Sequence, residues 1–212
     1  MSLTEFVMPM AATTNTIPML YWFFLNVFTR PELVAIIRDE VAAVTILETD
    51  GEGTRTAADV DVSRLEKGCP TLFACYRETL RLYSDVVGNR RVMEDTTLRD
   101  PTSGAEYLLR KGINVQWAGR LTHALEPIWG DDVKEFKPER WIGATSADEK
   151  GRRGAMIPFG GGKTLCPGRY FAQAELLGFV AALALGFEVE VEGGRAPEAT
   201  VAYLGTAVKR PV

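Results

Sequence analysis

The residues best suited to chemistry stand in one glycine-rich segment, Phe159–Gly168, which reads F-G-G-G-K-T-L-C-P-G. Its glycines let the backbone take positive φ angles and come close to a flat ligand. Cys166 follows the glycines, and Pro167 suits the first turn of a new helix. The positive end of a helix dipole favours an anionic sulfur, so this position suits a metal-binding thiolate. The segment therefore predicts a loop that offers the Cys166 sulfur to an iron atom.

A glycine-rich turn ahead of a buried, inert cysteine is the alternative interpretation, because most lone cysteines are not ligands. The spacing argues against that alternative. Four residues fix the pattern F-x-x-G-x-x-x-C-x-G, namely Phe159, Gly162, Cys166 and Gly168. A chain of this length matches such a pattern by chance roughly once in a thousand trials. The pattern resembles the haem-binding signature of the cytochrome P450 monooxygenases, in which the cysteine at the position of Cys166 is the axial iron ligand.

This resemblance implies a haem b cofactor (iron protoporphyrin IX) held by Cys166 as the metal ligand. The cofactor-binding positions that it carries over are Phe159, Gly160, Gly162, Lys163, Cys166 and Gly168. Arg90 matches a family arginine that reaches a haem propionate, and a guanidinium fork suits a carboxylate. An exposed strand arginine beside Arg91 is an equally good interpretation of Arg90. Thr164 departs from the arginine or histidine common at its position, and Lys163 or Arg169 would have to compensate.

Two further motifs lie upstream in the family's order. Residues 78–81 read E-T-L-R and are similar to its E-x-x-R element, and residues 136–141 read F-K-P-E-R-W and are similar to its F-x-P-E-R-W element. The resemblance implies that Glu78, Arg81 and Arg140 form a buried network with a structural role. Glu78 and Arg81 alone would be an i,i+3 pair that contributes only about 0.2–0.5 kcal/mol. Breaking a buried network costs roughly 3–5 kcal/mol.

Near the N-terminus, Ala11–Pro18 resembles the middle of the long helix that crosses the distal haem face. Asn15 and Thr16 match the catalytic positions there, and Thr16 would hydrogen-bond dioxygen and help deliver protons. Asn15 replaces the usual acidic residue. This asparagine form, together with C-P-G-R at the haem loop, resembles the branch that contains sterol 7α-hydroxylases and prostacyclin synthase. The alternative is a polar patch at a helix kink near Pro18.

The elements that must position these residues are mostly helices. Apolar residues recur at helical spacing over Cys69–Ser84, and Tyr170–Leu185 forms a second such segment. A helix capped by Thr29 is expected to run to Leu47. A loop is expected at residues 49–58, and small antiparallel strands are expected at 86–117. An irregular meander should follow at 121–160, and short strands at 187–191 and 201–204. The predicted fold is therefore mainly α with small antiparallel β-sheets, as in the C-terminal portion of the cytochrome P450 fold.

Family members are usually about twice as long as this chain, and all these motifs fall in their C-terminal half. We therefore expect residues 1–212 to be a partial cytochrome P450 domain without its N-terminal half. A longer chain with an N-terminal anchor would lie at the cytoplasmic face of the endoplasmic reticulum membrane. The apolar run Ile17–Phe28 is too short to span a membrane and is predicted to be buried core.

Composition excludes several other classes. With 46% hydrophobic residues, 25% charged residues and a net charge of −4, the chain is an ordinary globular segment without the basic runs typical of nucleic-acid binding. Three cysteines, of which Cys69 and Cys75 fall on a predicted buried helix, do not make a disulfide framework. The single histidine, His123, argues against a zinc site built from several imidazoles and is predicted to be structural.

The predicted function is insertion of one oxygen atom from dioxygen into a hydrophobic, sterol- or lipid-like substrate. The partner would be an NADPH-dependent cytochrome P450 reductase, steered by Arg152, Arg153, Lys163 and Arg169, although these side chains could equally serve the propionates or solvent. One alternative is a reductase-independent isomerase or dehydratase that acts on a peroxide. Another is an inactive haem-binding fragment, because half a domain exposes surface that the other half would cover.

Overall fold

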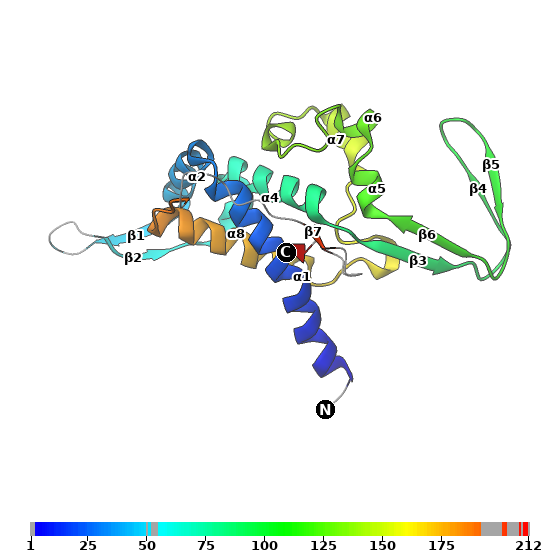
Figure 1. The fold of residues 1–212 in the computed structure, drawn as a ribbon, viewed down its shortest axis with the longest axis horizontal. Coiled ribbons are helices and arrows are strands. Elements are labelled where there is room, and N and C mark those ends of the chain that lie inside the picture. The colour runs from blue at the N-terminus through cyan, green and yellow to red at the C-terminus, as the bar shows by residue number, and fades with distance from the viewer. Residues whose placement is uncertain are drawn as a thin grey trace.

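Four long helices form the body of the protein. The computed structural model describes residues 3–49, 51, 55–191, 201–202, 208 and 210–211. The long helices are α1 (Leu3–Phe28), α2 (Pro31–Val44), α4 (Pro70–Tyr83) and α8 (Arg169–Gly186). Each of them contacts the other three, and Figure 1 shows the N-terminal part of α1, in dark blue, extending away from this group. This helical body confirms the predicted mainly α fold.

The remaining elements are short. The other helices are α3 (Val62–Gly68), α5 (Gly119–His123), α6 (Glu126–Trp129), α7 (Ser146–Arg153) and the 3-10 turns η1 (Pro138–Trp141) and η2 (Gly162–Thr164). The strands are β1 (Ile46–Thr49), β2 (Arg55–Asp59), β3 (Val87–Arg91), β4 (Thr96–Arg99), β5 (Glu106–Leu109), β6 (Asn114–Ala118), β7 (Val201–Ala202) and β8 (Arg210–Pro211). They pair as β1–β2, β3–β6, β4–β5 and β7–β8, all antiparallel. Small antiparallel sheets over residues 86–117 are thereby confirmed.

The core lies where the four long helices meet. Each helix turns an apolar stripe inward at i, i+4 spacing, as in Leu33, Ile37 and Val41 of α2, which are all buried. On α1, Phe23 and Val27 are fully buried, whereas Ile17 is 61% exposed, so the prediction that the run Ile17–Phe28 is core is confirmed except at its start. By length and hydropathy none of the described helices could cross a membrane alone, and only the bent pair 13–28 and 31–44, at 104°, passes that test jointly.

The start and end of α2 differ from expectation. Pro31 occupies its first turn, but the residue at the N-cap is Arg30. Thr29 instead donates its hydroxyl to the Leu25 carbonyl at 2.6 Å, where α1 ends. The prediction that Thr29 caps α2 is wrong, because the free carbonyls at the end of α1 are the nearer partners. The helix also ends at Val44 rather than Leu47, and residues 46–49 form strand β1.

Two segments outside the helices were also predicted wrongly. A hairpin occupies part of the expected 49–58 loop, because β1 pairs with β2 from Ile46 opposite Asp59 onward. Residues 187–191 form no strand. The guanidinium of Arg38 donates to the Phe187 carbonyl at 3.1 Å and to the Ala184 carbonyl, in the last turn of α8, at 2.7 Å. At Phe187 the backbone therefore binds a side chain of α2 instead of a strand. Of the expected strand at 201–204, residues 201–202 are confirmed and 203–204 lie outside the described residues.

The N-terminus of α4 is held by a carboxylate from a different helix. Glu40 of α2 accepts hydrogen bonds from the Thr71 N–H, at 3.0 Å to each carboxylate oxygen, and from the Leu72 N–H at 3.3 Å. The first amides of a helix have no partner within it, and the helix dipole is positive there. Glu40 therefore satisfies amides of α4 that no N-cap side chain reaches.

We expect Glu40→Gln to lower the free energy of unfolding by about 1–2 kcal/mol, because a neutral amide oxygen is a weaker cap than a carboxylate. Urea denaturation monitored by circular dichroism measures this change. Asp39→Asn removes the same charge from the exposed neighbouring position, and should change stability by less than about 0.5 kcal/mol. Equal losses of unfolding free energy in the two variants would contradict the capping of α4 by Glu40.

Candidate haem-thiolate site

The Phe159–Gly168 loop folds back on itself in front of α8. The Cys166 N–H donates to the Phe159 carbonyl at 3.1 Å, and the Leu165 N–H donates to the Gly162 carbonyl at 3.1 Å. Phe159 packs against the main core, so it anchors the start of the loop. The predicted binding residues of the segment thus lie on one closed turn, with the half-buried Cys166 at its end.

The glycines leave open space at this turn. Gly160 and Gly162 have φ angles of +75° and +64°, the left-handed region that favours glycine. A Cβ built on Gly160, Gly161 or Gly162 would meet no atom within 4 Å. One thiol beside such an unobstructed backbone fits a flat macrocycle whose iron takes a sulfur ligand. The described residues contain no group of three His, Cys, Asp or Glu side chains placed to hold a metal.

Helix α8 begins after Pro167, which was expected in its first turn. Gly168 is its N-cap and Arg169 its first residue, so Pro167 precedes the helix instead of lying in its first turn. Arg169 donates to the Cys166 carbonyl at 3.0 Å and lies 4.2 Å from the Tyr170 ring centroid. Arg169 therefore joins α8 to the cysteine turn. Lys163 and Thr164 are exposed on η2.

A buried ionic network supports this region from α4. Arg81 donates to both oxygens of Glu78, at 2.9 and 2.8 Å, and Arg140 of η1 donates to Glu78 at 2.8 Å. Glu78 is 0% exposed and Arg81 2% exposed, so water does not solvate their charges. The predicted contact among these three side chains is confirmed.

Main-chain groups complete the network. Arg81 also donates to the carbonyls of His123 and Val133 at 2.9 and 2.8 Å. Arg140 donates to the Trp129 carbonyl at 2.7 Å and to the side-chain carboxylate of Asp132 at 3.0 Å. Burial alone would lower the pKa of Arg140, but Glu78 and Asp132 outweigh it and raise that pKa. The two arginines thus fasten the irregular 121–141 segment onto α4.

His123 belongs to this framework. It is buried, and its Nε2 accepts a hydrogen bond from the Ile157 N–H at 3.0 Å. That bond ties α5 to the segment that leads into the Phe159 turn. The structural role predicted for His123 agrees with these contacts.

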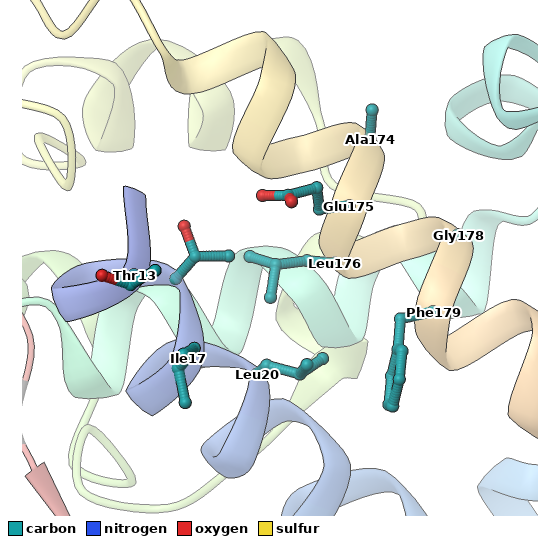
Figure 2. A pocket seen from close by; sticks show the side chains of 9 residues that line it. Thr13, Ile17, Leu20, Ala174, Glu175, Leu176, Gly178 and Phe179 are labelled. Carbon is teal, nitrogen blue, oxygen red and sulfur yellow. The ribbon is translucent and has the colours of Figure 1, made fainter. Parts of the chain in front are cut away.

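Thr16 and Asn15 lie in the irregular part of α1. Pro18 has no N–H to offer the Thr14 carbonyl, so the hydrogen-bond ladder is interrupted there. Thr16 lines a groove of about 570 Å³ between α1 and α8, together with Thr13, Ile17, Leu20, Ala174, Glu175, Leu176, Gly178 and Phe179. Figure 2 shows the labelled groove residues on these two helices. Both predicted catalytic residues are half-buried.

Arg90 lies in a separate part of the molecule. It sits on β3, where its guanidinium lies 5.0 Å from the Trp117 ring centroid and donates to the Asn89 carbonyl at 2.8 Å. Gly88 makes room for this ring, because a Cβ there would come within 2.0 Å of it. Among the described residues, no hydrogen bond joins Arg90 to the Phe159–Gly168 turn, so its predicted propionate contact stays a prediction.

Several residues of the network were not anticipated from the sequence. The Trp141 indole donates to Glu78 at 2.9 Å, and the Lys137 N–H donates to the same carboxylate at 3.2 Å. Asp132 pairs with both Lys137 and Arg140, and these contacts lower the pKa of Asp132. Trp141 was recognisable as part of the F-x-P-E-R-W motif, but Asp132 stands in no motif.

The three cysteines should differ sharply in reactivity. Cys69 and Cys75 are both 0% exposed, and burial raises the pKa of Cys69 from 9.0 to about 11 and that of Cys75 still further. At pH 8 a thiol with the pKa of Cys69 holds about 100-fold less thiolate than an ordinary thiol. We expect iodoacetamide to label the native chain once, at Cys166, as measured by mass spectrometry of peptides. Comparable labelling of all three would contradict the burial of α4.

Sequence comparisons agree with this fold and site. A model of the Cytochrome P450 family matches residues 2–210. A Cytochrome P450 monooxygenase of Gibberella zeae is 42% identical, over 86% of this chain and 34% of that protein. Cytochrome P450 monooxygenase nodJ of Hypoxylon pulicicidum is 28% identical, over 98% and 41%, and Cytochrome P450 52A5 of Candida maltosa is 33% identical, over 78% and 31%.

The chain thus spans between 31% and 41% of the length of these three relatives. Two of them are named monooxygenases. The matched region runs through α1, α4, η1, the cysteine turn and α8. On the family match and the relatives' identity together, the chain belongs to the cytochrome P450 family.

Proposed function

We propose that residues 1–212 are part of a haem-dependent monooxygenase domain in which the Cys166 thiolate is the axial ligand of haem b. The observation that carries this proposal is the closed turn at Cys166. It combines a half-buried thiol, two glycines with positive φ and open space beside the backbone. When bound, haem supplies the binding and reductive activation of dioxygen. Phe159, Gly160, Gly162 and Gly168 would shape its binding surface.

The remaining candidate residues are assigned roles that their positions permit. Lys163 is exposed on η2 and would bind a haem propionate. Arg90 would bind a propionate once its guanidinium moves off the Trp117 ring. Thr16 would donate a hydrogen bond from its hydroxyl at the wall of the α1–α8 groove, and Asn15 would orient a water for proton delivery.

We further propose a hydrophobic, sterol- or lipid-like substrate and an NADPH-dependent reductase as the electron donor. Exposed Lys163 on the cysteine turn would steer an acidic donor by long-range attraction. A longer form of the protein with an N-terminal anchor would act at the cytoplasmic face of the endoplasmic reticulum membrane. These assignments rest on the family resemblance and on charge.

The test is incubation of the haem-loaded chain with reductase, NADPH, isotope-labelled dioxygen and a panel of sterols and fatty acids. A monooxygenase forms product only with reductase and places one labelled oxygen atom in it. Conversion of an organic hydroperoxide without reductase would support an isomerase or dehydratase instead. Failure to take up haem would support an inactive fragment.

A further inference from the structure

A second, polar pocket lies between α4 and α7, separate from the cysteine turn and from the α1–α8 groove. Its volume is about 250 Å³, and its lining residues are Arg77, Glu149, Arg152, Arg153 and Met156. Three guanidinium groups and one carboxylate give this lining an excess of positive charge. Pockets of one charge sign concentrate ligands of the opposite sign.

Arg77 is only partly neutralised in this pocket. Its guanidinium lies 4.0 Å from the Trp141 ring centroid, and its Nη1 lies 3.5 Å from a carboxylate oxygen of Glu149. Charge-assisted hydrogen bonds are normally about 2.7–2.9 Å long, so this ion pair is loose. Burial lowers the pKa of Arg77, Glu149 opposes that lowering and Arg152 adds to it. The positive charges of Arg77 and Arg152 thus repel each other.

Arg152 and Arg153 both have guanidinium N–H groups that donate to no other described residue. Arg152 lies 5.8 Å from the Trp141 ring centroid and donates from Nη1 to the Arg140 carbonyl, whereas a guanidinium has five N–H groups. Arg153 is exposed and makes no hydrogen bond or ion pair within the described part of the chain. Both stand in the last turn of α7, where the negative end of the helix dipole stabilises cations.

We infer that this pocket binds a phosphate-class oxyanion. Guanidinium forks match the oxygens of phosphate, and a dianion would neutralise the charge excess. Glu149 then acts as an internal competitor for Arg77. Its side chain is 48% exposed, so it can turn away into solvent when an anion arrives. Free phosphate and a phosphate group on a nucleotide share this chemistry.

Anion binding should stabilise the contacts between α7 and the buried network. Arg77 stacks on Trp141, whose indole donates to Glu78, and Arg152 bonds the Arg140 backbone. An anion that joins these two arginines therefore holds α7 against the residues that support the cysteine turn. Ligands that bind only the folded state raise its stability with their concentration.

The test titrates the whole chain with inorganic phosphate, and in a second arm with AMP, at an ionic strength held constant with chloride. Tryptophan fluorescence and the melting temperature are the two readouts. We expect both to respond saturably to phosphate, because Trp141 lies against two of the binding guanidinium groups. Equal affinity in both arms would identify free phosphate as sufficient, and tighter binding of AMP would identify a nucleotide phosphate.

Two substitutions should move the affinity in opposite directions. Arg153→Gln removes an exposed donor and should weaken binding about 10-fold, a typical value for a charge-assisted hydrogen bond. Glu149→Gln removes the competing carboxylate and should tighten binding. Arg110→Gln makes the same charge change at an exposed site after β5 and should leave the affinity unchanged. A response that is linear in phosphate, or that is equal in Arg153→Gln and Arg110→Gln, would overturn the inference.

Discussion

Replacing Glu78 with glutamine is expected to lower the free energy of unfolding by about 3–5 kcal/mol. Glu78 accepts from both Arg81 and Arg140, and it is fully buried. Glutamine has nearly the same shape but no charge, and its amide group would present hydrogens to guanidinium donors. Buried Arg81 would then lack a counterion, and Arg140 would keep only Asp132. Chemical denaturation, with fluorescence and circular dichroism as probes, measures the loss.

Glu139→Gln is the matched control. Glu139 is exposed and stands next to Arg140, so this change alters net charge equally without touching the network. It should shift stability by less than about 0.5 kcal/mol. Should Glu78→Gln fail to fold, Trp141→Phe provides a milder test, since it removes one donor to Glu78 at a cost of about 1–2 kcal/mol. A Glu78→Gln protein as stable as the control would contradict the structural role of the network.

Replacing Cys166 with serine is expected to weaken haem binding by at least about 100-fold. Losing a partner that merely orients a metal ligand costs about 10- to 100-fold, so loss of the ligand itself should cost more. The fold should survive, because the Cys166 N–H that closes the turn on Phe159 is a backbone group. Absorbance titration with haem measures the affinity, and circular dichroism checks the fold.

Leu165→Ala serves as the control for this prediction. Leu165 is the adjacent residue of the same turn and is 38% exposed, so its truncation disturbs little packing. Its haem affinity should stay within a few-fold of the unsubstituted chain. Equal haem binding by the Cys166→Ser and Leu165→Ala proteins would show that Cys166 is not the haem ligand.

Motifs with fixed spacing were predictable from the sequence. The contact of Glu78, Arg81 and Arg140 was implied by the resemblance of two short motifs, 55 residues or more apart in the chain, to family elements, and the structure confirms it. The apolar spacing of α4 and α8 likewise gave helices whose ends fell within two residues of those observed. Each signal lies within a short stretch of sequence, either as fixed residue types at fixed spacing or as apolar residues at helical spacing.

Contacts between distant segments were not predictable in this way. Glu40 caps α4 from another helix, and Arg38 of α2 binds the backbone at the end of α8. In each case a side chain or carbonyl found a nearer partner through tertiary packing. A single sequence carries no record of such pairings, and the arginine pocket between α4 and α7 arises in the same manner.

The most direct test of the account is the absorbance difference spectrum, with and without carbon monoxide, of the reduced chain after expression with haem supplied. Thiolate-bound haem gives the long-wavelength Soret band from which the cytochrome P450 family takes its name. We expect that band, because Cys166 lies half-buried on an open, glycine-lined turn. Its loss in Cys166→Ser would assign it to this sulfur. A shorter-wavelength band, or no haem at all, would contradict a thiolate site in this chain.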